Sequence, residues 1–150
     1  MSPEPLSRGE WIEAVTSANS GAQRRELVES CPEHHTRQSS VDVQASLVAR
    51  IYAQPEAALR LSELADWIAR ANHDPYSEGI GFRAGAHVAY VQTRYHDAAQ
   101  LYRAAATQFR GLGEESEVAR TLSSGLQALI YLGQYEEARD WGAEAGGILS

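Results

Sequence analysis

The 150-residue chain contains no lysine, a single cysteine and no long hydrophobic run. A lone Cys31 excludes an internal disulfide and is typical of a protein from a reducing cytoplasm. The longest mostly apolar stretch, 126–132, is far too short to cross a bilayer. The first residues, MSPEPLSRGEW, lack the apolar core of a secretory signal. We therefore expect a cytoplasmic protein without a membrane partner.

Positive charge is also scarce. The 13 basic residues, all arginine, face 20 acidic residues, which gives a net charge of -7. This balance argues against nucleic acid or an anionic membrane as the main partner. With 43% hydrophobic and 22% charged residues, the composition is that of one globular domain with a packed core.

Alternating β-branched runs are missing, and helix-forming residues fill the chain. Alanine alone accounts for about one residue in six. Clusters of Gly, Pro and Asn separate the periodic segments, which predict helices near 8–17, 22–30, 41–53, 56–71, 78–93, 96–110, 115–132 and 135–148. Ser40 and Ser77 are expected to cap the third and fifth helices, and 31–39 is expected to be a loop.

One pattern recurs with a 40-residue period, in PEAALRLSELA (55–65), YHDAAQLYRAA (95–105) and YEEARDWGAEA (135–145). A period of about 20–50 residues is the mark of stacked repeats that bury their apolar faces against one another. Short turns between successive helices predict antiparallel hairpins. Residues 1–38 do not carry the pattern. Their apolar side chains predict an atypical helical cover for the first repeat, through Trp11, Ile12, Val15, Leu27 and Val28.

Small side chains recur where the helices of a hairpin are expected to meet. In the middle unit, Phe82, Ala86, Val88 and Ala89 form one apolar stripe, and the facing helix presents Ala98, Leu101, Tyr102 and Ala105. Alanine at such a joint permits close approach of the two helix axes. Replacing Ala98 with leucine should overpack the joint by about 1–3 kcal/mol and lower the thermal midpoint. An unchanged midpoint would count against close contact there.

The motif A-x-x-L-[YW]-x-x-A, preceded by Y-x-x-A, resembles the second helix of a tetratricopeptide repeat, and YLGQYEEAR (131–139) resembles that family's turn. The resemblance covers about 41–150. It implies an all-α fold, a right-handed α-solenoid of antiparallel hairpins with three repeats of the 40-residue variety, at 39–74, 75–114 and 115–150. The first-helix Gly or Ala of the family is matched by Ser46 and Ala86 but not by Leu126. The segment RTLSSGLQALIYLGQYEEARDW (120–141) also resembles the amino-terminal repeats of bacterial proteins with a caspase-like CHAT protease domain.

Tetratricopeptide arrays bind peptides on a concave face lined by first-helix side chains. The resemblance carries this role to Arg50, Arg83, His87, Tyr90, Arg120, Gln127 and Tyr131. Three arginines with Tyr and His suit an acidic or C-terminal peptide, because guanidinium pairs bidentately with carboxylate. The asparagines of the family's carboxylate clamp are missing here, so a clamp of that type is not expected. The alternative is that these residues form solvated helix faces.

The sequence offers few candidates for catalysis or metal binding. C-P-E-H-H contains Cys31, His34 and His35, but a zinc site normally needs four ligands and no second pair lies nearby. A Gly-x-Ser-x-Gly elbow is missing. The run GIGFRAG (79–85) follows no strand and lacks phosphate-loop spacing. We therefore expect no enzymatic activity, no metal and no cofactor.

The third unit ends at Gly146-Gly147-Ile148-Leu149-Ser150 without a polar capping helix. Repeat arrays ordinarily need such a cap, so Trp141, Ile148 and Leu149 are expected to be partly exposed. The chain is then a fragment, self-associates through this helix, or tolerates the exposure. We expect a non-catalytic scaffold or sensor module that binds a protein or peptide, the amino-terminal part of a larger bacterial protein. The alternatives are a regulatory segment of a CHAT-type cysteine protease whose catalytic domain lies elsewhere, and the sensor part of a transcription regulator.

Overall fold

The computed structural model describes residues 4–150, and in this range it contains helices and no strand. The helices are α1 (Arg8–Ser17), α2 (Gly21–Glu29), α3 (Arg37–Arg50), α4 (Pro55–Asn72), α5 (Pro75–Val91), α6 (Tyr95–Gly111), α7 (Glu115–Tyr131) and α8 (Tyr135–Leu149), with one 3-10 turn, η1 (Pro32–His34). The all-α prediction is confirmed. No helix in the described range is long and apolar enough to cross a membrane.

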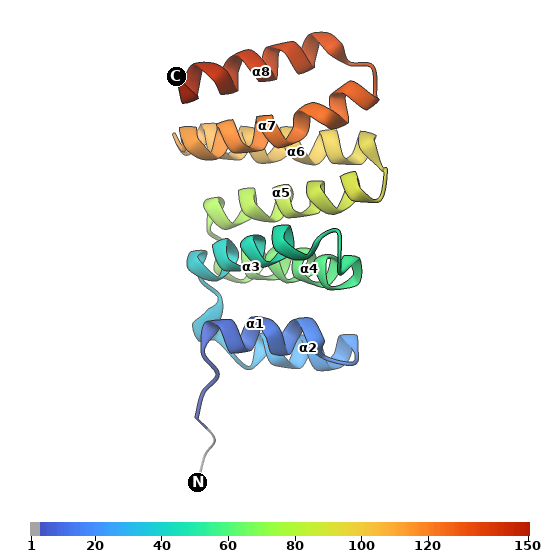
Figure 1. Cartoon of the computed structure of the whole chain (residues 1–150). Coiled ribbons are helices and arrows are strands. Elements are labelled where there is room, and N and C mark those ends of the chain that lie inside the picture. The colour runs from blue at the N-terminus through green and yellow to red at the C-terminus, as the bar shows by residue number, and fades with distance from the viewer. Residues whose placement is uncertain (1–3) are drawn as a thin grey trace.

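The helices lie across the long axis of an elongated molecule and follow one another from one end to the other (Figure 1). From α3 onward each helix packs mainly against its neighbours in the chain, and α3 also packs against α5. In Figure 1, α3 and α7 lie on the near side, in front of α4 and α6. The face formed by α3, α5 and α7 is therefore separate from the face formed by α4 and α6.

The repeat period reappears in the backbone. Left-handed residues occur at His73 (φ 52°) and Gly113 (φ 71°), and again at Thr93 (φ 63°) and Gly133 (φ 75°). The members of each pair are one repeat apart, and each residue follows the end of a helix. A left-handed residue after the last helical turn lets the chain reverse direction. The repeat is thus expressed in turn geometry as well as in the apolar pattern.

The two predicted caps are wrong. α3 is capped by Thr36, whose Oγ1 accepts a hydrogen bond from the Ser39 N–H at 3.2 Å, while Ser40 is buried inside the helix packing. The helix therefore begins inside the expected 31–39 loop. α5 is capped by Asp74, which accepts from the Tyr76 N–H, and Pro75 is its first residue.

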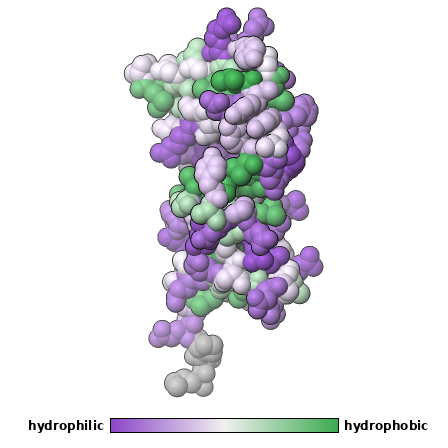
Figure 2. Space-filling view, turned by 45° about the vertical axis from the view of Figure 1, so that its right-hand side comes forward, coloured by the Kyte–Doolittle hydropathy of each residue, from purple (hydrophilic) through white to green (hydrophobic). Residues whose placement is uncertain are grey.

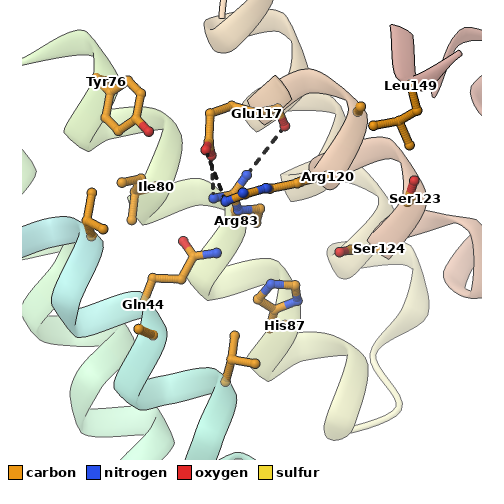
Figure 3. A pocket seen from close by; sticks show the side chains of 14 residues that line it. Gln44, Tyr76, Ile80, Arg83, His87, Glu117, Arg120, Ser123, Ser124 and Leu149 are labelled. Atoms are coloured by element: carbon orange, nitrogen blue, oxygen red, sulfur yellow. Dashed lines mark hydrogen bonds and ion pairs between the residues drawn. The ribbon is translucent and has the colours of Figure 1, made fainter. Parts of the chain in front are cut away.

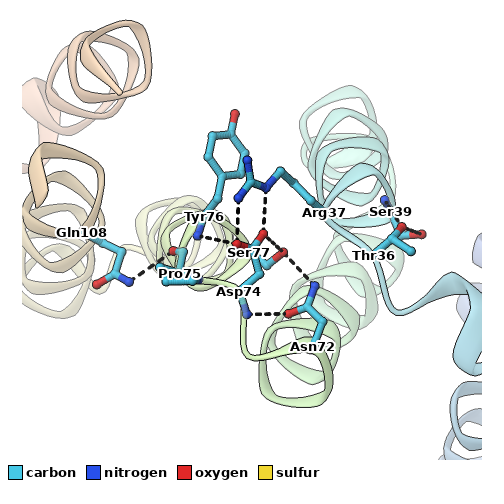
Figure 4. Close-up of polar contacts among 9 residues, drawn as sticks. All are labelled: Thr36, Arg37, Ser39, Asn72, Asp74, Pro75, Tyr76, Ser77 and Gln108. Carbon is cyan, nitrogen blue, oxygen red and sulfur yellow. Dashed lines mark hydrogen bonds and ion pairs between the residues drawn. The ribbon is translucent and has the colours of Figure 1, made fainter. Parts of the chain in front are cut away.

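Asp74 is the centre of a polar cluster that joins the starts of α3 and α5 (Figure 4). Nε and Nη2 of Arg37 each donate to one Asp74 oxygen at 2.8 Å. Ser77, the residue expected to be the cap, instead donates its hydroxyl to Asp74 at 3.2 Å. The Arg37 guanidinium, more than any other neighbour, lowers the pKa of Asp74 to about 2.

The apolar interior forms two buried clusters, one around α1–α5 and one around α5–α8. Trp11 is fully buried and donates its indole N–H to the Leu27 carbonyl at 2.9 Å. It shares the first cluster with Ile12, Val15 and Val28, and Leu27 packs on that cluster half-buried. In the second cluster, Ala86, Ala89, Ala98, Tyr102 and Ala105 are buried as expected.

Phe82 is a correction. It is 37% exposed and lines a groove with α4 and α6 residues on the face opposite α3 and α7. Its position in the chain suited the apolar stripe, but Ala86 and Ala89 pack in the buried cluster with α6, and the closest approach is at Gly79, where a Cβ would lie 2.7 Å from the Phe109 ring. The small side of α5 faces Phe109 at this point, and Phe82 lies at the edge of the contact, partly exposed.

The last helix is better covered than its sequence indicates. Trp141 is only 6% exposed, because it packs over Gly125 of α7, and the expectation of an exposed Trp141 is wrong. Ile148 is half-buried and Leu149 is exposed. The outward residues of α8 are largely polar or small, namely Glu136, Arg139, Asp140, Ala143 and Gly146. Ion pairs Arg103–Glu137 and Arg110–Glu144 tie this helix to α6.

Candidate functional site

A groove of about 730 Å³ runs over α5 between α3 and α7. Figure 3 shows α3 along one side with Gln44, α7 along the other with Glu117, Arg120, Ser123 and Ser124, and α5 between them. Its lining side chains come from all three helices and from the end of α8, namely Val41, Gln44, Ala45, Val48, Tyr76, Ile80, Arg83, His87, Glu117, Ala119, Arg120, Ser123, Ser124 and Leu149.

Arg83 lies on the floor of the groove and is buried. Its Nη2 donates to Glu117 Oε2 at 2.6 Å, and its Nη1 donates to the Thr121 hydroxyl at 3.1 Å. With its amide oxygen turned toward the guanidinium, Gln44 accepts from Nε at 2.6 Å. Buried charges are tolerated only when they are paired and hydrogen-bonded in this way. The Arg83 donors are therefore engaged within the protein and do not face a ligand.

Arg120 differs from Arg83 in its exposure. Its side chain is 73% exposed on the α7 side, and its closest acidic partner, Glu117, lies 3.5 Å away and already pairs with Arg83. One carboxylate thus serves two guanidinium groups. The groove keeps one excess positive charge, located at Arg120.

His87 lies one helical turn beyond Arg83. Its Nδ1 is 2.7 Å from the Tyr102 hydroxyl, which is buried beneath it. Burial, and to a lesser extent the charge of Arg83, lowers the pKa of His87 to about 4. Burial also raises the pKa of Tyr102, so its hydroxyl keeps its proton. If Tyr102 donates to Nδ1, the neutral imidazole carries its own proton on Nε2 as a donor.

Three tyrosine rings pack together beyond His87, where α5, α6 and α7 meet their turns. Tyr95 and Tyr131 stack with ring centroids 4.6 Å apart and planes 11° apart, and Tyr90 lies 5.6 Å from Tyr95. This tyrosine cluster, Tyr90, Tyr95 and Tyr131, has no space between its rings for a ligand group.

Comparisons with protein-family models, curated proteins and solved structures found no match for this chain.

The seven residues expected on the binding face divide into three groups. Arg83, His87 and Arg120 line the groove together. Tyr90 and Tyr131 belong to the tyrosine cluster. Arg50 and Gln127 do not line the groove: Arg50 pairs with Glu13 of α1, and Gln127 is exposed on α7. The prediction of three arginines facing an acidic ligand therefore reduces to Arg120.

The apolar side of the groove is formed by residues outside the set expected from the sequence. Val41, Ala45 and Val48 line it from α3, and Tyr52 follows one turn later in the exposed turn after the helix. Their spacing of i, i+4, i+7 and i+11 marks one helix face. A second stripe, Val43, Leu47 and Ile51, faces the core. The two stripes on one helix were a readable signal, because a helix that only covers a core needs one.

In the Cys31 region, both histidine rings lie against backbone carbonyl oxygens. His34 Nε2 lies 2.8 Å from the Leu6 carbonyl and His35 Nε2 lies 2.7 Å from the Val28 carbonyl. Both rings also pack near Trp11. Within residues 4–150, no group of three His, Cys, Asp or Glu side chains is placed to hold a metal ion. These histidines connect the first hairpin to the segment that enters α3.

Proposed function

We propose that this chain is a non-catalytic protein-interaction module, a right-handed solenoid of tetratricopeptide type that binds a protein or peptide segment in the groove over α5. The observation that carries the proposal is the exposed apolar stripe on α3. Val48 is 54% exposed although it faces a concave surface between helices. Apolar side chains in a groove contribute to binding because a partner that covers them removes their surface from water, which is favourable.

Other features of the structure support binding over chemistry. The buried polar groups of the groove pair with one another, Arg83 with Glu117 and Thr121, and His87 with Tyr102. A floor held by such contacts keeps its shape when a partner binds, which lowers the entropy lost in the complex. The left-handed turns that recur with the repeat period support the repeat architecture. Hydrophobic residues also reach the surface at several levels of the stack, between hydrophilic ones (Figure 2).

Site-specific photo-crosslinking in cells of the source organism tests the proposal. A benzophenone amino acid replaces Val48 in the groove, and in the matched control it replaces Phe82 on the opposite face. Both positions are exposed, so neither replacement should disturb folding. We expect defined protein adducts from position 48 and few from position 82. Adducts from position 82 alone, or none from position 48, would overturn the groove as the binding face.

A further inference from the structure

The two sides of the groove differ in chemistry. The α3 side is apolar and consists of Val41, Ala45 and Val48. The α7 side presents Arg120, Ser123 and Ser124, all exposed. A segment lying between α3 and α7 therefore meets hydrophobic surface on one flank and hydrogen-bonding groups with a positive charge on the other. Such a segment must itself have one apolar and one polar side.

The α3 stripe has the length and period of a helix contact. From Val41 to Tyr52 the helix and its turn rise by about 16 Å, at about 1.5 Å per residue. Side chains at i, i+4, i+7 and i+11 form a ridge, and ridges of this kind pack into the grooves of a second helix.

Backbone hydrogen bonding also distinguishes a helix from an extended segment. A buried extended peptide needs partners for its own N–H and C=O groups. The groove is built from helix surfaces, and the described part of the chain has no strand edge that could supply them. Its side-chain hydrogen-bonding groups that are neither buried nor paired are few, chiefly Ser123 and Ser124. A helix satisfies its backbone internally and needs no such partners.

We propose that the partner is an amphipathic α-helix of about three turns, with its apolar stripe on Val41, Ala45 and Val48 and an acidic residue beside Arg120. This inference rests on the proposed function, because it names what occupies the same groove. The charge assignment follows from Arg120 being the exposed cation of the groove, whereas Arg83 is already neutralised by Glu117. Because the groove has one exposed cation, the partner helix needs one acidic residue beside it and not a run of carboxylates.

A two-library selection tests the class of partner. The full chain is used to select from a display library of helix-forming 16-residue peptides and from a library of unpatterned linear peptides, with counter-selection on Val48→Asp. We expect helical sequences with apolar residues at i, i+3 or i+4 and i+7 and an acidic flank. Groove-dependent enrichment of linear or proline-containing sequences would overturn the helix while leaving the proposed function standing. No enrichment over Val48→Asp from either library would overturn the proposed function itself.

A charge swap on the selected peptide tests its orientation. Arg120→Glu should weaken binding at least about tenfold, and a peptide with its acidic flank changed to lysine should restore binding to that variant. Arg139→Glu is the matched control, because Arg139 is exposed on α8 and does not line the groove. Equal effects of the two substitutions, or failure of the lysine peptide to recover affinity, would overturn the placement of an acidic residue beside Arg120.

Discussion

The same left-handed turn is formed by a different residue type at two positions one repeat apart. Thr93 and Gly133 occupy equivalent positions in successive repeats, and both have a positive φ, of 63° and 75°. Left-handed backbone costs an L-residue about 1–2 kcal/mol, and a β-branched residue such as threonine adopts it least easily. Glycine adopts it without a steric penalty. Thr93 is therefore a strained residue in a turn that the next repeat makes without strain.

Exchanging the two residue types should give opposite effects. Gly133→Thr is expected to destabilise the fold by about 1–2 kcal/mol. Thr93→Gly should stabilise it by less, about 0.5 kcal/mol, because glycine gains entropy in the unfolded chain. Urea denaturation of each single variant measures both effects. Shifts of the same sign would show that turn strain is not what distinguishes the two positions.

Ser40 is a second residue whose environment is unfavourable. Its side chain is fully buried, and its Oγ has no hydrogen-bond partner among the described residues. A buried hydroxyl without a partner costs about 1–3 kcal/mol, and alanine is also the better helix former. Ser40→Ala should therefore raise the free energy of unfolding by about 1 kcal/mol, measured by urea denaturation.

Ser39 is the matched control for Ser40. It is equally buried, but its hydroxyl lies 3.1 Å from the Thr36 hydroxyl and accepts its hydrogen bond. Ser39→Ala should give no gain in stability. An equal gain from both substitutions would indicate a general helix-propensity effect in α3 and would contradict the cost assigned to the unpaired hydroxyl.

At the scale of helices, the number, the order and most of the starts could be predicted to within one residue, whereas the starts of α3 and α5 could not. Alanine-rich segments between Gly, Pro and Asn clusters predict where helices lie, because helix propensity and helix breaking depend on the local sequence. These two starts depend on which of several polar residues becomes the N-terminal cap of the helix. Ser40 and Ser77 stood closest to the apolar pattern, whereas the caps are Thr36 and Asp74. Asp74 is held by Arg37 from another helix, a contact that no local pattern reveals.

Two helices approach most closely where one of them carries a glycine that leaves no room for a Cβ atom. A Cβ at Gly125 would lie 2.4 Å from Cζ3 of Trp141, whereas a Cβ at Gly85, the equivalent position one repeat earlier, would lie 3.5 Å from the Leu101 side chain. The first distance is a clash and the second is ordinary contact. The family's small first-helix residue corresponds to Leu126, but the close approach of the two helices occurs one residue earlier, at Gly125.

This contrast predicts opposite outcomes for the same substitution at equivalent positions. Gly125→Ala should cost about 1–3 kcal/mol, because the rigid indole must move. Gly85→Ala should stabilise the protein by about 0.5–1 kcal/mol through helix propensity. Thermal unfolding followed by circular dichroism compares the two. A Gly125→Ala variant as stable as Gly85→Ala would contradict the packing of Trp141 over α7.

For the whole molecule, the residues that line the groove could be predicted only in part. The repeat register placed Arg83, His87 and Arg120 on one face, and all three line the groove. It could not show that Glu117, distant in the sequence from Arg83, neutralises that arginine, because the pairing depends on how α7 lies against α5. The prediction of an exposed Trp141 failed for a related reason. A glycine on another helix created the space that buries it.

Stability of the whole chain should depend on pH through His87. The unfolded chain protonates this histidine near its ordinary pKa of about 6.5, whereas the folded protein does so only near 4. Between these values the unfolded state binds more protons, so acid favours unfolding. The contribution is complete above pH 6.5 and is lost as the pH falls through 4. Its full size is about 3 kcal/mol, because the two pKa values lie about 2.5 apart and one pKa unit corresponds to about 1.4 kcal/mol.

Urea denaturation of the wild type and of His87→Gln between about pH 7.5 and 4 isolates this effect. Glutamine has no titratable group and can still hydrogen-bond to Tyr102, so the free energy of unfolding of the variant should fall less steeply with acid. Asp74, with a folded pKa of about 2 and an unfolded value of 3.8, also contributes near the acid end of this window, but it contributes equally in both proteins. The difference between the two curves therefore reports on position 87 alone. Parallel curves would show that His87 is protonated as easily in the folded groove as in water, and the neutral imidazole assigned to the groove would then be wrong.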